Sequence, residues 1–321
     1  MINHILVPLD GSSLAECVVP HALAVARATQ ARITLLHVLE RPHATGELPT
    51  DPLHWHLKKS AIQGYLDGFT ERLQDSGLEV VNTILEGIPA ERIIEYADAE
   101  GVDLIALSTH GQSGLSGWNV SSVVQKIILR GYKSTLLVRA YKPSTVEAGR
   151  PHTFQRLFVG LDCSARAEMV LPVAASLSQY YKAKLILGTV IRNPELVHRF
   201  PPSAEDQELV DRLSERNRRA AEHYIEQLAA QFSLQGIDLK TFQVPSNNVI
   251  ATLHDLVEQE DADLVMLVAH GHSSEFRWPY GSVATSFIDY GNTALMVMQD
   301  LPGDEIQRTQ AELAARETKG H

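Results

Sequence analysis

Two kinds of hydrophobic pattern alternate along the chain. Residues 5–7 and 104–107 are apolar at successive positions, as in strands that are covered on both faces of a parallel sheet. Between them, apolar residues recur every three or four positions over 18–26, which indicates a helix. Ser13, with Glu16 three residues on, fits a capping box at its start. In the first half we expect strands at residues 4–9, 32–39, 79–85, 103–108 and 134–139, and this alternation predicts an α/β fold with a doubly wound parallel sheet.

The second half of the chain repeats the first. Residues 4–12 (HILVPLDGS) reappear as residues 156–164 (RLFVGLDCS), and residues 103–107 (DLIAL) reappear as residues 263–267 (DLVML). Solenoid repeats are only about 20–50 residues long, so this much longer period indicates a duplicated domain. We therefore expect tandem domains over residues 1–142 and 154–300, a linker over 143–153 and a mobile tail over 301–321.

The charge balance limits the partners of the protein. The 321 residues carry 28 Lys and Arg against 39 Asp and Glu, a net charge of −11, which disfavours binding to a nucleic acid backbone. Two cysteines are too few for a disulfide framework and fit a reducing compartment. Without a signal-peptide pattern or an apolar run near the ~20 residues that span a bilayer, we expect a cytoplasmic protein with no membrane partner.

The carboxyl ends of the predicted strands are the expected ligand-binding edge, because open parallel sheets bind ligands there. Asp10 ends the first strand and Asp162 ends its repeat, each followed two residues later by a serine. Such a carboxylate can accept hydrogen bonds from a ribose hydroxyl or an adenine amine. Helix capping by the aspartate and serine is the alternative.

A second pattern lies after the fourth strand. Residues 108–111 (STHG) are followed by nine residues and then by residues 121–122 (SS), which begin a predicted helix. The repeat has residues 268–271 (VAHG), nine residues and residues 281–282 (GS). Small residues before a helix N-terminus allow an anion to approach its backbone N–H groups. A plain crossover loop is the alternative, although the equal spacing in both halves favours a constraint.

This arrangement resembles the universal stress protein family, whose nucleotide-binding members carry G-x2-G-x9-G-(S/T) after strand four and an aspartate after strand one. The resemblance covers both halves and implies a five-stranded sheet of order 3-2-1-4-5 in each domain. It also implies a bound adenine nucleotide (ATP, ADP or AMP, with or without Mg), with adenine at Asp10 and the backbone of Val38, and phosphates at Gly111 and residues 121–123. The binding residues expected in the first domain are Pro8, Asp10, Ser12, Val38, Ser108, His110, Gly111, Ser113, Ser121, Ser122 and Val123. Those expected in the second are Leu161, Asp162, Ser164, Val190, Val268, His270, Gly271, Gly281, Ser282 and Val283.

Both loops depart from the family pattern. Ser108 and Val268 stand where the first motif glycine belongs, and Ser121 stands where the third belongs. In the second loop, Phe276, Trp278 and Tyr280 are expected to narrow the pocket, so we expect two unequal sites.

The motifs that are absent favour a binding module over an enzyme. The sequence has no Gly-x4-Gly-Lys-Ser/Thr, so no Walker lysine serves phosphate transfer. We expect a stress-response protein that binds adenine nucleotides as a regulatory switch or partner-binding module, with slow or no hydrolysis. A nucleotide-dependent enzyme and an interaction protein with degenerate sites remain the alternatives. We assign no metal to the alternate histidines at residues 54–56 and 270–272. We interpret Cys163 as a buried, inert thiol, with a redox-sensitive thiol at a helix N-terminus as the alternative.

The fifth strands predict how the halves assemble. An unpaired edge strand over residues 134–139 or 293–298 would expose a row of backbone donors and acceptors. Universal stress proteins pair this strand across a twofold axis, so the resemblance implies an antiparallel pairing within one chain. We expect such an intramolecular pseudo-dimer, and leave open a further homodimer and an unknown protein partner.

Overall fold

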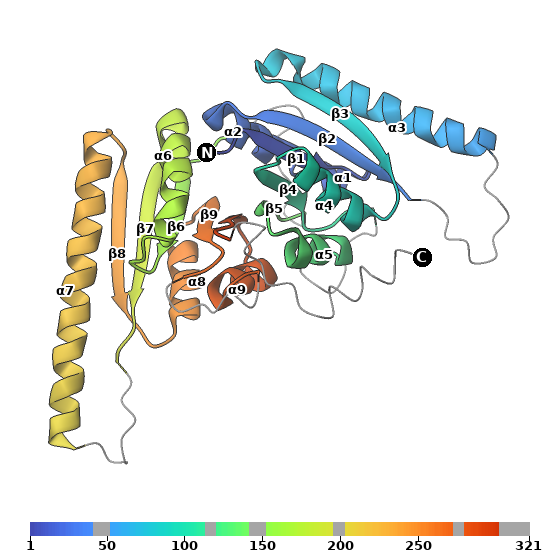
Figure 1. Ribbon diagram of the computed structural model, residues 1–321. Helices are drawn as coiled ribbons and strands as arrows, with labels where there is room; N and C mark the ends of the chain where they lie inside the picture. Colours follow the sequence, from blue (N-terminus) through green and yellow to red (C-terminus); the bar gives the residue numbers. More distant parts are fainter. Residues whose placement is uncertain (41–51, 113–119, 141–151, 195–202, 272–278, 302–321) are drawn as a thin grey trace.

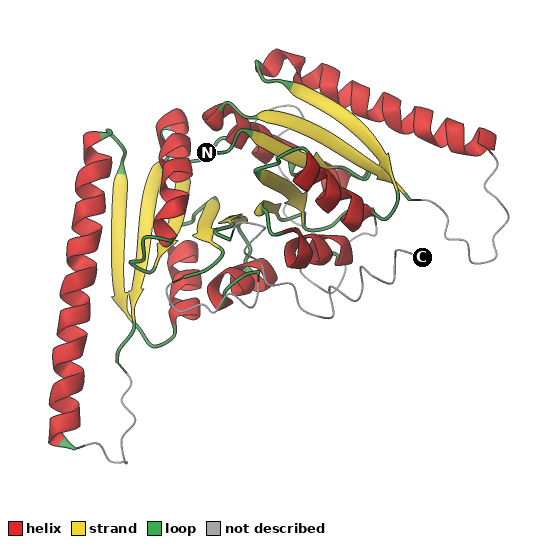
Figure 2. Cartoon of the chain, in the orientation of Figure 1, coloured by secondary structure: helices red, strands yellow, loops and turns green. Residues whose placement is uncertain are grey.

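The structure is a computed structural model that describes residues 1–40, 52–112, 120–140, 152–194, 203–271 and 279–301. These residues form one ten-stranded sheet with helices packed on both faces (Figures 1 and 2). The predicted linker and tail lie almost wholly outside the described residues. No helix within the described ranges is long and apolar enough to cross a membrane.

Each half of the chain contributes five strands, and the strands of the first half begin and end within one residue of their predicted bounds. The first half forms β1 (His4–Pro8), α1 (Ser13–Glu16), α2 (Val19–Thr29), β2 (Arg32–Leu39), α3 (Pro52–Leu73), a 3-10 turn (Gln74–Ser76), β3 (Val80–Glu86), α4 (Pro89–Ala99), β4 (Leu104–Ser108), α5 (Ser122–Gly131) and β5 (Ser134–Val138). The second half forms β6 (Arg156–Leu161), a 3-10 turn (Ala167–Val170), α6 (Leu171–Tyr181), β7 (Lys184–Ile191), α7 (Ala204–Leu234), β8 (Leu239–Pro245), α8 (Val249–Gln259), β9 (Leu264–Val268), α9 (Ser282–Tyr290) and β10 (Ala294–Met298).

The sheet order is β3-β2-β1-β4-β5-β10-β9-β6-β7-β8. Read from either outer edge, each half has the predicted order 3-2-1-4-5, and all pairs within a half are parallel. The two halves meet where β5 pairs with β10 in antiparallel register, with Leu137 opposite Leu295 and Thr135 opposite Val297. The expected antiparallel pairing of the fifth strands is therefore confirmed, and it leaves neither β5 nor β10 as an open edge. We call this pairing the β5–β10 junction.

The core has one layer on each face of the sheet, and both layers run through both domains. Ile5 and Val7 belong to one layer and Leu6 to the other, because successive side chains of a strand point to opposite faces. Buried residues of α2, α3, α6 and α7 complete the first layer, and those of α4, α5, α8 and α9 complete the second. The strands are thus covered on both faces, as their unbroken apolar runs predict.

The predicted capping box at Ser13 is wrong by one residue. Ser12 is the N-cap of α1, and its hydroxyl accepts the N–H of Ala15. Ser12 has the extended backbone that an N-cap needs (φ −92°, ψ 149°), whereas Ser13 is already the first residue of the helix. The expected single helix is also two helices, α1 and α2, with Pro20 in the first turn of the second.

Side chains and helices reinforce the β5–β10 junction. The guanidinium of Arg139, at the end of β5, is buried and donates to the carbonyls of Phe287 (2.6 Å) and Ile288 (3.0 Å) near the C-terminus of α9. On the opposite face α2 packs against α6, where the Tyr181 hydroxyl donates to the carbonyl of Ala24 (3.0 Å). A cation at the carbonyl end of a helix is favourable, so Arg139 links the domains at little cost.

Candidate functional site

Asp10 connects the loops that follow β1 and β4. One carboxylate oxygen accepts the backbone N–H (3.0 Å) and the hydroxyl (2.6 Å) of Ser12. The other accepts the backbone N–H of Gln112 at 2.5 Å, from a residue 102 positions further along the chain. The parallel order of β1 and β4 brings these two loops to the same edge of the sheet. The sequence-based expectation that Asp10 and the motif after strand four meet therefore matches the geometry.

Of the two interpretations of the aspartate motif, ligand binding and helix capping, the capping role belongs to the serine and not to the aspartate. Ser12 caps α1, while Asp10 holds Ser12 in place. The same contacts recur in the second domain, where Asp162 accepts the N–H (3.1 Å) and hydroxyl (2.6 Å) of Ser164. A carboxylate offers about four acceptor positions, so Asp10, which accepts these three hydrogen bonds, can still accept one from a ligand.

Gly111 and Gly271 lie against these two carboxylates. A Cβ placed on Gly111 would overlap the Asp10 carboxylate and lie only 3.0 Å from its Cγ, and a Cβ on Gly271 would overlap that of Asp162. Neither glycine has a positive φ. Close approach of a carboxylate, rather than backbone conformation, therefore explains why a glycine is needed at each position.

The helix after each loop begins beside the end of the fourth strand. The N–H of Ser121 donates to the carbonyl of Thr109 (2.8 Å), and the N–H of Gly281 donates to that of Ala269 (2.7 Å). Ser121 caps α5 by accepting the N–H of Val124 (3.4 Å), whereas Gly281, at the same position before α9, has no side chain to do so. The two helix N-termini therefore differ in the N–H groups that they can offer to an anion.

The expected ligand-facing residues of the helices lie together at these N-termini. Ser122 and Ser282 are exposed, and Val123 and Val283 are half-buried. Ser113, Phe276 and Trp278 lie outside the described residues. Tyr280 is described, and the expectation that it narrows the pocket is wrong: its ring is buried, and its hydroxyl lies 3.0 Å from that of Thr135 in the β5–β10 junction.

The residues before the two glycines differ between the domains. Ser108, in place of the family's glycine, is buried, with its hydroxyl 2.6 Å from the carbonyl of Leu14 and 2.8 Å from that of His110. Its side chain therefore holds the loop rather than facing a ligand. Val268, its counterpart, is only partly buried at the end of β9.

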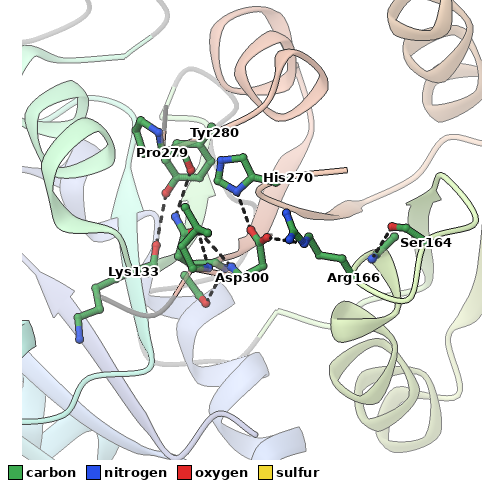
Figure 3. Close-up of polar contacts among 11 residues, drawn as sticks. Lys133, Ser164, Arg166, His270, Pro279, Tyr280 and Asp300 are labelled. Carbon is green, nitrogen blue, oxygen red and sulfur yellow. Dashed lines mark hydrogen bonds and ion pairs between the residues drawn. The ribbon is translucent and has the colours of Figure 1, made fainter. Parts of the chain in front are cut away.

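The two loop histidines are also held differently. The Nδ1 atom of His110 lies 3.2 Å from the hydroxyl of Thr109. The Nδ1 atom of His270 lies 2.7 Å from the Asp300 carboxylate, which pairs at 3.1 Å with Arg166 (Figure 3). Both histidines are buried, so neither extends freely into solvent as a general acid or base.

The second strand of each domain contributes one buried polar group that sequence reasoning missed. Val38 and Val190, the expected adenine contacts, are half-buried near the ends of β2 and β7. The preceding residues, His37 and Thr189, are buried. Among the described residues, His37 Nδ1 and Thr189 Oγ1 have no hydrogen-bond partner. The repeat offered a signal, because aligning residues 31–38 with 183–190 places both polar residues at one position of an apolar strand.

Burial lowers the pKa of His37, and a hydrogen bond of the ring with the backbone of Leu9 and then the charge of Asp10 act against that shift. The imidazole beside the first site is therefore neutral at pH 7, and one ring nitrogen can accept a hydrogen bond. A buried polar atom without a partner is rare in proteins and fits a group that a ligand completes.

A tyrosine beside each site was also missed. The Tyr65 hydroxyl donates to Glu16 at 3.0 Å, and burial, Glu16 and the charge of Asp10 raise its pKa. In the second domain, burial and the carboxylate of Glu168 likewise raise the pKa of Tyr224. Both tyrosines are fully protonated at neutral pH and can act only as neutral hydrogen-bonding groups. No pattern in the sequence pairs these distant residues.

The residues that the structure describes also contain a cleft of about 320 Å³ between the domains, lined by His21, Arg139, Asp263 and their neighbours rather than by either candidate site. In the same described ranges, no group of three or more His, Cys, Asp or Glu side chains could hold a metal ion. The described residues of the two sites offer hydrogen-bond donors and carboxylates at one edge of a parallel sheet.

Comparison with known sequences identifies the class of protein. The sequence profile of the Universal stress protein family matches the chain twice, over residues 1–139 and 153–299. The chain therefore belongs to the universal stress protein family, as a tandem member with two family domains. Universal stress protein MJ0531 of Methanocaldococcus jannaschii is 28% identical over 145 residues, which span 44% of this chain and 85% of that protein. YxiE of Bacillus subtilis is 28% identical over 149 residues, 43% of this chain and all of that protein.

Solved structures share the tandem fold. A universal stress protein from Archaeoglobus fulgidus superposes with a TM-score of 0.61 at 16% identity, covering 93% of this chain and 99% of its own. A putative universal stress protein from Pseudomonas aeruginosa gives 0.62 at 17% identity, covering 92% and 93%. At these identities the likeness concerns the fold.

Proposed function

We propose that this protein is a stress-response protein that binds an adenine nucleotide (ATP, ADP or AMP) at the carboxyl edge of each domain and acts as a regulatory switch or partner-binding module. The observation that carries the proposal is the contact between a carboxylate and a glycine, Asp10 with Gly111, repeated as Asp162 with Gly271. In both domains this contact lies beside the N-terminus of a helix at the same spacing. Membership of the family supports the same interpretation.

In the proposed complex, Asp10 or Asp162 accepts hydrogen bonds from the ribose or the adenine amine, and the backbone of Val38 or Val190 contacts the base. His37 and Thr189, each with a buried polar atom that lacks a partner, directly precede these two valines, and the charge of Asp10 reaches His37. Backbone N–H groups of the residues that begin α5 and α9 bind the phosphates, with Mg²⁺ as an additional counter-charge. Such N–H groups attract anions even in a protein with a net charge of −11.

Native mass spectrometry of freshly purified protein tests the proposal directly, because a retained nucleotide adds its own mass. Calorimetry with ATP, ADP and AMP, with and without Mg²⁺, then gives the affinities and the number of sites. Gly111→Val and Gly271→Val serve as single-site variants, since a branched side chain at either position would displace the aspartate. Absence of retained nucleotide together with no measurable binding of all three would contradict the proposal.

Hydrolysis is a separate measurement. The proposed sites contain no lysine at the position of a Walker motif, so we expect ATP turnover to be slow or absent. Phosphate release by wild-type protein, compared with the Gly111→Val/Gly271→Val variant, checks this. Rapid release that disappears in the double variant would favour a nucleotide-dependent enzyme.

A further inference from the structure

Tyr280 joins the second candidate site to the first domain. It directly precedes Gly281, the N-cap of α9, where the proposed phosphate-binding turn begins. Its hydroxyl lies 3.0 Å from that of Thr135. It also donates to the carbonyl of Lys133 at 3.3 Å (Figure 3). Thr135 is in β5 and pairs with Val297 in the β5–β10 junction. The turn of one domain is therefore hydrogen-bonded to the strand of the other.

Gln299 supports the same turn from the end of β10. Its side-chain amide donates to the carbonyl of Pro279 (3.1 Å), the residue before Tyr280. Its backbone N–H donates to the hydroxyl of Ser134 (3.1 Å) at the start of β5. Both residues that lead into Gly281 are thus held by groups at the junction.

Asp300 holds the other half of the second site. Its carboxylate, only 1% exposed, accepts from His270 Nδ1 at 2.7 Å and pairs with Arg166 at 3.1 Å. His270 precedes Gly271 in the loop after β9, while Arg166 follows Asp162 and Ser164 in the loop after β6. A buried carboxylate between two such groups is costly to displace, because either partner would lose a buried charge or hydrogen bond.

The first domain has none of these groups at the corresponding positions. By the offsets of the repeat, Val120 corresponds to Tyr280, Ala140 to Asp300 and Leu14 to Arg166. A valine, an alanine and a leucine cannot form these bonds with their side chains. The two sites therefore differ in how they are held, although their aspartates and glycines match.

We propose that Tyr280 and Asp300 are positioning residues of the second site. Through them, the affinity of that site for the phosphates of a nucleotide depends on the β5–β10 junction. The affinity of the first site does not depend on the junction. This inference rests on the proposed function for the identity of the ligand. Its structural part, a turn held in place from the other domain, can be tested without any ligand.

The binding test uses Tyr280→Phe and Thr135→Val, both in a Gly111→Val background that leaves only the second site. Each change removes one hydroxyl, so we expect ATP to bind roughly three- to tenfold more weakly, the size expected for one hydrogen bond. Adenosine affinity should stay within about twofold, because the turn faces the phosphates. The double variant should lose little more than Tyr280→Phe alone, since that change already removes the bond to Thr135 together with the one to the Lys133 carbonyl. Asp300→Ala should weaken ATP binding more than tenfold.

Two controls make the test specific. Tyr290→Phe removes the hydroxyl of an exposed tyrosine at the far end of the same helix and should change nothing. Tyr280→Phe in a Gly271→Val background should leave ATP affinity at the first site unchanged. Equal losses for ATP and adenosine, or additive losses in the double variant, would overturn the positioning role.

Amide hydrogen exchange of the nucleotide-free protein separates this inference from the proposed function. We expect residues 269–271 and 281–283 to exchange faster in Tyr280→Phe and Thr135→Val, and at the wild-type rate in Tyr290→Phe. If wild-type protein binds no nucleotide at the second site, the proposed function fails there, and faster exchange still supports the coupling. Wild-type exchange rates in both variants would overturn the inference whatever the ligand.

Discussion

The Asp10 carboxylate occupies the space that a side chain at Gly111 would need. Cγ of Asp10 lies 3.0 Å from the position of a Cβ on Gly111, although the two residues are 101 positions apart in the sequence. The next residue, Gln112, donates its N–H to the same carboxylate. One contact thus ties the loops after β1 and β4, and the repeat places Asp162 against Gly271 in the same way.

Gly111→Ala should therefore abolish nucleotide binding at the first site. The added methyl group displaces Asp10, which breaks its bonds to Gln112 and Ser12 together with the proposed ribose contact. We expect at least a tenfold loss of ATP affinity and a decrease in stability of about 1–3 kcal/mol, the usual range for overpacking. Calorimetry in a Gly271→Val background and urea unfolding measure the two effects.

Gly64→Ala is the matched control, because a Cβ on this glycine of α3 meets nothing within 4 Å. It should preserve ATP binding and slightly increase stability, since alanine is a better helix former than glycine. Asp10→Ala combined with Gly111→Ala should recover the stability lost to the overlap, but neither the hydrogen bonds of Asp10 nor the binding. Unchanged ATP affinity in Gly111→Ala would refute the assigned role of the contact.

Leu137→Pro should separate the two domains. Leu137 lies opposite Leu295 in β10 and opposite Leu107 in β4, so its N–H lies in the interior of the sheet, where proline cannot donate a hydrogen bond. We expect the single cooperative unfolding transition of the wild-type chain to split into two. The radius of gyration from X-ray scattering should rise as the domains move apart.

Leu137→Val preserves the N–H and serves as the control for that prediction. It should unfold in one transition, with only the cost of a smaller buried side chain. If Leu137→Pro retains one transition and the wild-type radius of gyration, the β5–β10 junction does not hold the domains together.

The sheet could be predicted from the sequence because each strand is indicated by its own residues and most strands occur in two similar copies. Runs such as residues 104–107 are apolar at successive positions, and a strand with both faces covered needs no other signal. The duplication then supplied a second copy of every motif. The strand order came from the resemblance, and the aspartate and glycine motifs could be placed at one edge because parallel strands end together.

What the sequence could not indicate depends on contacts between distant side chains. Tyr280 lies in a motif loop, and only the structure reveals that its ring turns towards Thr135 in the other domain. The pair of Asp300 with Arg166 joins residues 134 positions apart, and neither belongs to a motif. Ser12 rather than Ser13 caps α1, because Ser12 has the extended backbone and its hydroxyl donates to Asp10. The spacing of residues alone does not distinguish between these two neighbouring serines.

Cys163 should react slowly with thiol reagents. It stands where the first domain has Gly11, and both residues have a positive φ. The residue is exposed, so the expectation of a buried thiol is wrong. Desolvation of the thiol and the neighbouring Asp162 carboxylate nevertheless raise its pKa to about 11, which argues against an activated nucleophile. In a Cys17→Ser background at pH 8, we expect alkylation by iodoacetamide to be on the order of 100-fold slower than that of free cysteine.

Asp162→Asn tests the stated cause of the slow reaction. Removing the negative charge should lower the thiol pKa and accelerate alkylation severalfold, whereas the distant exposed change Asp261→Asn should have no effect. Alkylation of Cys163 at the rate of free cysteine would show that its pKa is not raised.

His21 makes the protein sensitive to acid at the contact between the domains. Its ring is buried in α2 and stacks on His152, with 4.3 Å between the ring centroids. Burial, and then the charge of His152, lower its pKa from 6.5 to about 3. Because the folded state holds His21 neutral while the unfolded chain protonates it near pH 6.5, protons favour the unfolded state below that pH.

The stability that His21 contributes should be fully present above pH 6.5 and lost progressively as the pH falls from 6.5 towards 3. One such group can lower the free energy of unfolding by at most about 1.4 kcal/mol per pH unit in this window. We expect urea unfolding of the wild type at pH 7.5, 5.5 and 4.5 to show a free energy of unfolding that falls with pH within this limit. When each free energy is expressed relative to the same protein's value at pH 7.5, the decrease should be smaller in His21→Leu. His54→Gln, at an exposed histidine of α3, should retain the wild-type slope. Equal slopes for the wild type and His21→Leu would mean that the ring is not held neutral by its surroundings.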